Sequence, residues 1–422
     1  MKIAVIGSGI AGLSTAWLLA RQHQVCLFEA NDYAGGHSNA VDVSLDGTTH
    51  PVDTGFLVFN RQTYPNLTQL FNLLDVEVAN TDMGFSVRLP ADNIEWAGSN
   101  LQSLFAQKTN LFKPRFWLMI SDILRFNKNA IQLLELAKAQ NLTLGQLLKA
   151  NHYREPFINW YLLPMGAAIW STPSQDMLNF PAESFLQFCL NHGLLQINNR
   201  PQWLTVNKSS REYVSRMCAG IGDVRLNTPV YKVTPSLEGV LVSHKHGSEL
   251  FDKVVLATHS DQSLAMLDDV TEQEYAILSA IKYAPNEAFL HTDSSVMPKN
   301  KVAWSAWNYY NSPQDTPNAP VAVTYWLNKL QPLPFSSQVF VTLNPPLAIE
   351  PKYIIKRFEY AHPQLDTEAY AAQKQLVKIQ GQRGIYFCGA WAGYGFHEDG
   401  LKAGMRVARL LGTTIPWQAV YE

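Results

Sequence analysis

The sequence predicts an α/β protein in which a Rossmann-like dinucleotide-binding domain is interrupted by an inserted substrate domain. Three observations support this fold class: a glycine-rich turn between a strand and a helix at the start of the chain, a similar strand and turn near its end, and a middle that changes from helical to strand periodicity. We expect a discontinuous nucleotide domain of residues 1–75, 200–265 and 375–415, and a substrate domain of residues 76–199 and 266–374. A chain of 422 residues is long enough for both.

The first residues of the chain carry a dinucleotide-binding pattern. The apolar strand KIAVIG leads into GSGIAG and then into the helix LSTAWLLARQ. Gly7 permits a tight turn, Gly9 lets a pyrophosphate approach the backbone, and Gly12 lets the helix pack on the strand. Ile10 and Ala11 begin the helix, whose N-terminal amides and dipole favour phosphate.

A second strand, QVCLFE, ends on Glu29, seventeen residues after Gly12. A carboxylate at this place accepts hydrogen bonds from the adenosine ribose hydroxyls and repels a 2'-phosphate, so NADP is disfavoured. This unit alone does not decide between NAD and FAD.

The next segments resemble a known family. FEANDYAGGH and PVDTGFLVFN are similar to the FAD fingerprint and the following strand of the flavin-dependent amine oxidase superfamily, which includes phytoene desaturases and protoporphyrinogen oxidases. The resemblance implies an amine-oxidase-like fold and FAD contacts from Ala30, Gly35, Gly36, His37, Thr54 and Gly55. His37 stands where the superfamily usually has arginine, so phosphate binding would depend more on backbone amides. A histidine in a surface turn is the alternative reading of His37.

Composition and charge exclude several classes of protein. With 33 basic and 35 acidic residues the formal charge is −2, so nucleic acid is not expected as a partner. The longest apolar run, residues 157–170, is shorter than the roughly 20 residues of a transmembrane span. The chain opens on a strand and leaves no room for a signal peptide, and its four cysteines are widely spaced. These features are typical of a cytoplasmic protein with reduced thiols and no zinc site.

The pattern is mostly helical from about residue 64 to 200, and such a block resembles the helical part of the superfamily's substrate domain. Within it, LFKPRFWLMI combines Lys113 and Arg115 with Phe112, Phe116 and Trp117. This mixture suits docking on a membrane surface or a lipid head group. A partly buried helix start with solvated cations is the alternative.

Later segments imply further contacts with cofactor and substrate. By resemblance, NTPVYKV places Val230 near the adenine, and KVVLATHS returns beside the nucleotide with Ala257 and Thr258. From 285 to 360, short strands separated by prolines predict an antiparallel sheet, which by resemblance roofs the flavin and walls the substrate pocket. Strand alternation places about half of the aromatic candidates on the cofactor side. These candidates are His291, Trp304, Trp307, Tyr309, Tyr325 and Trp326.

Near the C-terminus, the strand GIYFCG is followed by GAWAGYGFHEDGLKAG. In the superfamily this turn and helix N-terminus cover the flavin, which implies cofactor contacts from Gly389, Ala390, Glu398, Asp399, Gly400 and Leu401. Consecutive helical residues point about 100° apart, so His397 and the two acids are not expected to share a metal. The acids are expected to bind hydroxyls or to cap amides, and His397 is a substrate candidate. No cysteine lies between 389 and 404, so non-covalent FAD is predicted.

The predicted function is an FAD-dependent oxidoreductase that takes hydride from a hydrophobic substrate, such as a fatty acyl chain or another lipid. A flavin amine oxidase and a non-catalytic FAD protein that binds lipid or a partner are the alternatives. No catalytic residue can be assigned from spacing. VDTGFLVFNRQTYPNL and YFCGAWAGYGFHEDGLKAG resemble a bacterial group described as predicted NAD/FAD-binding proteins. Genes of that group neighbour cyclopropane-fatty-acid synthase-like methyltransferases, which implies a lipid methyltransferase as partner.

Overall fold

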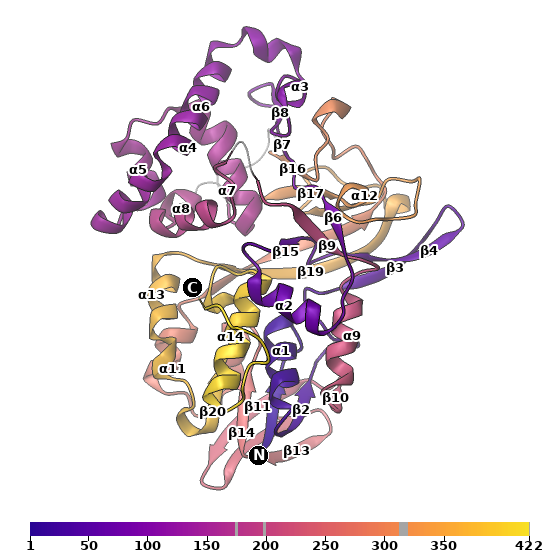
Figure 1. Ribbon diagram of the computed structural model, residues 1–422, viewed down its shortest axis with the longest axis vertical. Helices are drawn as coiled ribbons and strands as arrows, with labels where there is room; N and C mark the ends of the chain where they lie inside the picture. Colours follow the sequence, from indigo (N-terminus) through magenta and orange to yellow (C-terminus); the bar gives the residue numbers. More distant parts are fainter. Residues whose placement is uncertain (174–175, 197–199, 312–319, 422) are drawn as a thin grey trace.

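The computed structural model describes residues 1–173, 176–196, 200–311 and 320–421. A five-stranded parallel sheet lies in its lower part (Figure 1). The strand order is β10 (Asp223–Arg225), β2 (Gln24–Phe28), β1 (Lys2–Ile6), β14 (Lys253–Leu256) and β20 (Ile385–Phe387). Most residues of β1, β2 and β14 are buried, as continuous apolar strands are when helices cover both faces of a parallel sheet.

Helices from both ends of the chain pack beside this sheet. Figure 1 shows α14 (His397–Leu410) alongside α1 (Ile10–Leu19). A Cβ at Gly400 would lie 2.7 Å from Ile10 Cγ2, and one at Gly404 would lie 2.5 Å from Ser14 Oγ, so these two glycines allow the close approach. The other helices of this region are α2 (Pro65–Leu73), α9 (Arg211–Ala219), α10 (Ser260–Met266), α11 (Glu272–Leu278) and α13 (Thr367–Gln375).

Three small antiparallel sheets accompany the parallel one. They are the hairpin of β3 (Ala40–Leu45) and β4 (Thr48–Asp53), the sheet of β5 (Phe59–Asn60), β9 (Trp203–Val206) and β6 (Val78–Thr81), and the meander of β11 (Val230–Ser236), β12 (Gly239–His244) and β13 (Gly247–Phe251).

A seven-stranded sheet crosses the middle of the molecule (Figure 1). Its order is β19 (Ile354–Gln364), β15 (Lys282–His291), β18 (Phe340–Leu343), β17 (Ala322–Trp326), β16 (Trp307–Tyr310), β7 (Phe85–Leu89) and β8 (Ile94–Ala97). The pairs are antiparallel except β16 with β7. The expected helical pattern from residue 64 is therefore wrong for 78–97, because β6, β7 and β8 extend sheets whose other strands come from distant segments.

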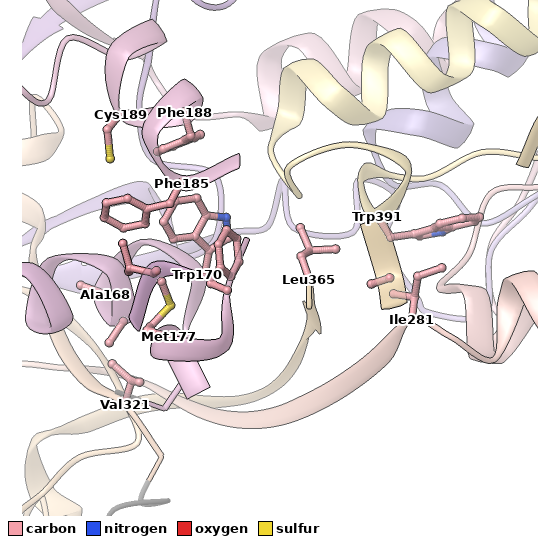
Figure 2. Packing of buried hydrophobic residues seen from close by; sticks show 14 of the residues in the cluster. Ala168, Trp170, Met177, Phe185, Phe188, Cys189, Ile281, Val321, Leu365 and Trp391 are labelled. Carbon is pink, nitrogen blue, oxygen red and sulfur yellow. The ribbon is translucent and has the colours of Figure 1, made fainter. Parts of the chain in front are cut away.

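A helical block covers the upper part of Figure 1. It contains α3 (Leu101–Leu104), α4 (Pro114–Gln140), α5 (Leu144–Ala150), α6 (Glu155–Phe157), the π-helical turn η2 (Ile158–Leu162), α7 (Leu163–Trp170) and α8 (Ala182–Asn191). Its core is aromatic, and Figure 2 shows Trp170 packed with Phe185 and Phe188, with Leu365 and Trp391 across from them. Among the described helices, none is both long and apolar enough to cross a membrane.

Candidate functional site

A cavity of about 840 Å³ is lined by the ends of β1 and β14, by β19, and by residues of α7 and α8. Its volume is large for a small-molecule site, for which about 300–1,000 Å³ is usual. The strands β1 and β14 are neighbours, but the chain passes from β1 to β2 on the other side. Their carboxyl ends therefore flank the crevice in which open α/β sheets bind ligands.

The glycine turn after β1 forms one end of the cavity. Gly7 has a φ of +97°, and a Cβ there would lie 2.9 Å from the Ala257 carbonyl oxygen. A Cβ at Gly12 would overlap the Gly7 carbonyl oxygen, whereas one at Gly9 would meet no atom within 4 Å. Protein atoms therefore explain the glycines at 7 and 12, while Gly9 borders the open space of the cavity.

Two further segments close around this turn. A Cβ at Gly36 would lie 3.0 Å from the Cα of Gly9. Glu29 is 7% exposed, and its Oε2 accepts hydrogen bonds from the Ser8 amide at 3.0 Å and the Ser8 hydroxyl at 2.5 Å. Its Oε1 accepts from the amide of Asn31 at 2.9 Å. The carboxylate is thus held in place at the cavity wall.

Three histidines line the cavity near the glycine turn: His37, His259 and His362. His37 stacks on Tyr360 with ring centroids 4.8 Å apart, and its ring lies 5.4 Å from that of His362. Burial lowers the pKa of His37 to about 3 and that of His362 to about 4. Both rings are therefore neutral at neutral pH. We call this end, with Gly7, Gly9, Gly36 and the three histidines, the glycine-turn half.

His397 begins α14 and joins a buried polar cluster at the cavity wall. Its Nε2 lies 3.0 Å from Ser38 Oγ and 2.9 Å from the Tyr213 hydroxyl, and these two oxygens also share a hydrogen bond. The ring stacks on Phe56 at a centroid distance of 3.7 Å. Burial lowers the pKa of His397 to about 3, so it presents a neutral imidazole.

The opposite end of the cavity, the aromatic half, is built from side chains. It is lined by Tyr64, Ile169, Trp170, Phe188, His192, Leu194, Trp203, Trp307, Tyr325 and Phe396. Phe188 stacks on Phe396 at 4.9 Å and on His192 at 3.9 Å. Trp307 meets Tyr325 edge to face at 4.8 Å. Most of these lining side chains are aromatic, so the wall suits an apolar ligand.

The sequence profile of the flavin-containing amine oxidoreductases matches residues 10–411. The chain belongs to the flavin-containing amine oxidoreductase family. The family, the fold class and the FAD cofactor predicted from the sequence are thereby confirmed. Non-covalent attachment stays a prediction, and no cysteine is among the described residues that line the cavity.

Two curated relatives match part of this flavin-family chain. It is 41% identical over 107 residues to the carotenoid phi-ring synthase of Streptomyces griseus, covering 25% of this chain and 19% of that protein. It is 33% identical over 122 residues to the 1-hydroxycarotenoid 3,4-desaturase of Flavobacterium sp. (strain P99-3), covering 26% and 24%. The matches thus span about a quarter or less of these relatives' length.

Solved structures share the whole fold. A fatty acid isomerase of P. acnes that produces CLA superimposes with a TM-score of 0.68 and 14% identity, covering 97% of both chains. A putative protoporphyrinogen oxidase of Exiguobacterium sp. 255-15 gives 0.66 and 14%, covering 97% of this chain and 98% of that one. At these identities the likeness shows the fold alone.

The residues of the glycine-turn half fit FAD. The open space above Gly9, the amides at the start of α1 and the carboxylate of Glu29 offer what a dinucleotide needs at its pyrophosphate and ribose. Most residues predicted to bind cofactor line the cavity: Gly7, Gly9, Ile10, Ala11, Glu29, Ala30, Gly36, His37, Gly55, Val230, Ala257, Thr258, Gly389 and Ala390.

The other predicted cofactor residues lie behind this lining. Gly12 packs on Gly7, and Gly35 donates its amide to the Ser8 carbonyl at 3.1 Å. Thr54 donates its hydroxyl to the Asn39 carbonyl at 3.1 Å. These residues shape the cavity wall without lining it.

Four predicted cofactor residues at the start of α14 are outside the described cavity lining. Glu398 accepts the amides of Asn66 and Leu67 at the start of α2, and Asp399 accepts the Phe396 amide at 3.0 Å. Gly400 and Leu401 pack against α1 and its core. Both acids therefore cap amides, one of the two roles expected for them.

Two of the six aromatic candidates from the strand region, Trp307 and Tyr325, line the cavity. The substrate candidate His397, at the start of α14, also lines it. His291 is fully buried and bonds Thr342 Oγ1 at 2.7 Å, and Trp304 Nε1 donates to the Pro298 carbonyl at 2.8 Å. Tyr309 is buried in the core, and Trp326 Nε1 donates to Gln338 at 2.7 Å. None of these four is among the described lining residues.

Sequence reasoning missed several lining residues. Tyr360 and His362 stand two apart on β19 and so share one face of the strand. Phe188 on α8 and His192 at its C-cap stand four residues apart and share a helix face. Both spacings are visible in the sequence, but neither segment carries a motif that points to the cofactor.

Proposed function

We propose that this chain is an FAD-dependent oxidoreductase that takes hydride from a hydrophobic substrate, a fatty acyl chain or another lipid, by desaturation or oxidation. One observation carries the proposal: a single cavity joins the glycine-turn half, which suits FAD, to an aromatic half that suits an apolar molecule. FAD, when bound, supplies the two-electron acceptor for such a reaction. The chain's own residues bind the substrate, orient it and exclude water.

The charges around the cavity favour a neutral substrate over an amine. Among the described lining residues, the acids are Glu29, after β2, and Glu359, on β19. The aromatic half contributes no carboxylate from its described residues, and His192 there is neutral because burial lowers its pKa to about 4. An ammonium group would lose its hydration without gaining a counter-charge. Two curated relatives are named for carotenoids, which agrees with a lipid substrate.

Three measurements separate the candidate functions. Lipids of the host, compared by gas chromatography with and without the gene, should differ in unsaturation or oxidation. Peroxide release from a panel of amines would instead favour an amine oxidase. Flavin that is photoreduced and never reoxidised by any acceptor would favour a binding protein. Purified protein that takes up no FAD would refute all three.

We also propose contact with a membrane surface through an apolar tip at α3, η1 (Lys108–Phe112) and the start of α4. Figure 1 places α3 at the upper end of the molecule. Phe112 is 85% exposed and Leu101 75%, and Lys108 and Arg115, on either side of Phe112 in the sequence, are exposed. Exposed apolar groups flanked by cations suit an anionic lipid surface. The predicted methyltransferase partner rests on the sequence resemblance alone.

Vesicle sedimentation tests this contact. Phe112→Ser should reduce binding to vesicles that contain anionic lipid. Leu237→Ser is the matched control, since Leu237 is fully exposed in the turn between β11 and β12. Equal binding of both variants and the wild type would rule out this tip as the contact.

A further inference from the structure

Two asparagines, Asn286 on β15 and Asn344 directly after β18, form a hydrogen-bonded chain with a fixed direction. Asn344 accepts the Glu287 amide on its Oδ1 at 3.0 Å and donates its Nδ2 to the Val321 carbonyl at 3.1 Å. A backbone amide can only donate and a carbonyl can only accept, so the orientation of this side-chain amide is determined. The same Nδ2 donates to Asn286 Oδ1 at 2.7 Å.

The hydrogen-bonded chain continues from Asn286 to His362 at the cavity wall, and its direction is retained. Its Oδ1 is the acceptor for Asn344, so its Nδ2 is the donor, and it serves the Ala284 carbonyl at 3.0 Å. The same Nδ2 lies 3.1 Å from Nδ1 of His362. Asn286 is 4% exposed, so water does not compete for these bonds.

The chain determines where His362 carries its proton. Because Nδ1 accepts a hydrogen bond, the neutral ring is protonated on Nε2. Burial lowers the pKa of His362 to about 4, which agrees with a neutral ring. Nε2 of His362 has no hydrogen-bond partner among the described residues. It is also not one of their buried side-chain nitrogen and oxygen atoms that lack a partner, so it is not closed off from the cavity. Since His362 lines the cavity, this N–H is available to a ligand there.

The position of His362 determines which bound ligand its Nε2–H group can reach. Its ring lies 5.4 Å from that of His37, which directly follows Gly36 on the segment that closes over Gly9. The free N–H therefore belongs to the glycine-turn half and not to the aromatic half. A dinucleotide in the glycine turn offers acceptor atoms there, either phosphate oxygens or heteroatoms of the flavin ring.

We propose that His362 donates a hydrogen bond from Nε2 to an acceptor atom of bound FAD, and that Asn286 and Asn344 are positioning residues that set its tautomer. This inference rests on the FAD binding of the proposed function. Asn286 acts through His362, because its contacts are to protein atoms.

Four variants of the full chain test the proposal. His362→Phe should weaken FAD binding by about 2- to 10-fold, the range for one hydrogen bond. His362→Gln keeps an N–H donor and should recover part of the loss, and Asn286→Leu should lose affinity because the tautomer is released. His246→Gln is the matched control, since His246 is exposed and outside the described cavity lining.

The readouts separate the two kinds of acceptor. A phosphate acceptor predicts that His362→Phe also weakens ADP binding, while a flavin acceptor predicts unchanged ADP binding with a shifted absorption spectrum and reduction potential. Nitrogen-15 NMR of labelled histidine should show the Nε2–H tautomer of His362 in the wild type and its loss in Asn286→Leu.

Two outcomes would overturn the inference. One is a proton on Nδ1 in the wild type, and the other is wild-type affinity, spectrum and potential in folded His362→Phe and Asn286→Leu. Failure of the wild type to bind FAD would instead remove the proposed function on which the inference rests.

Discussion

The two halves of the cavity are specified in different ways. In the glycine-turn half, missing side chains create the site: a Cβ at Gly7 or Gly12 would meet backbone atoms, and Gly9 leaves space for a ligand. In the aromatic half, large side chains from α7, α8, β16 and β17 create it. We therefore expect the first half to be damaged by added atoms and the second by removed atoms.

Added atoms at two neighbouring glycines should have different effects. Gly12→Ala places a Cβ on the carbonyl oxygen of Gly7, and this backbone atom cannot move without distorting the turn. We therefore expect a loss of about 4 kcal/mol or more in the free energy of unfolding. In Gly9→Val the Cβ would meet no protein atom within 4 Å, so the variant should fold, but its side chain would occupy the cavity beside the turn and should weaken FAD binding by at least about tenfold. Denaturant titration and FAD titration measure the two effects.

A reversed pattern, with Gly9→Val unfolded and Gly12→Ala normal, would show that the turn does not have this shape. Normal FAD affinity in a folded Gly9→Val would show that the nucleotide does not approach the backbone there.

Removed atoms should matter most at Trp170. This side chain is 5% exposed, and its ring lies 4.8 Å from that of Phe180 and 4.7 Å from that of Phe188. Figure 2 shows Trp170 beside Phe188. Trp170→Ala should cost about 3–5 kcal/mol of stability in denaturant titration, because a large buried ring leaves a void. Its folded fraction should bind FAD normally. Trp117→Ala, at a site 47% exposed, is the control and should cost much less.

The same contrast explains what the sequence could predict. The turn at Gly7 and Gly9 depends on local backbone geometry, so the strand, glycines and helix are visible in a short stretch. The strands within residues 78–97 were not predicted, because β7 pairs with β16, more than two hundred residues away, and β8 enters the sheet only through β7. His362 was missed for a similar reason: its proton position depends on Asn286 and Asn344 of two other strand segments.

Acidification should lower the stability contributed by both halves of the cavity, since each half carries a buried neutral histidine. Burial lowers the pKa of His37 to about 3 and that of His192 to about 4, below the unfolded value of about 6.5. Their contribution to stability is present above pH 6.5 and is lost as pH falls toward the folded values. His37→Gln or His192→Gln should flatten this loss by at most about 1.4 kcal/mol per pH unit.

The titration of Asp53 should change the stability with pH in the opposite direction to that of the two histidines. Burial raises the pKa of Asp53 to about 7, although the amide and hydroxyl of Ser210 donate to its carboxylate. Its contribution is present at low pH and is lost as pH rises through about 7. Asp53→Asn should therefore steepen the loss of stability on acidification. Unfolding curves of the FAD-free chain between pH 4 and 8 measure these slopes, and the same sign for His37→Gln and Asp53→Asn would contradict the assignment.

The smallest effect is expected at Glu398, which belongs to neither half. Its Oε1 accepts the Asn66 amide at 3.0 Å and its Oε2 the Leu67 amide at 2.9 Å, so it caps α2, whose own N-cap residue makes no such bond. Glu398→Gln keeps one acceptor oxygen and should lower the free energy of unfolding by about 1–2 kcal/mol. FAD affinity should stay unchanged, because the carboxylate faces α2 and is outside the described cavity lining. Glu135→Gln, at an exposed position of α4, is the control. Weaker FAD binding with unchanged stability in Glu398→Gln would instead restore this carboxylate to the cofactor site and show that α14 turns its first residues toward the nucleotide.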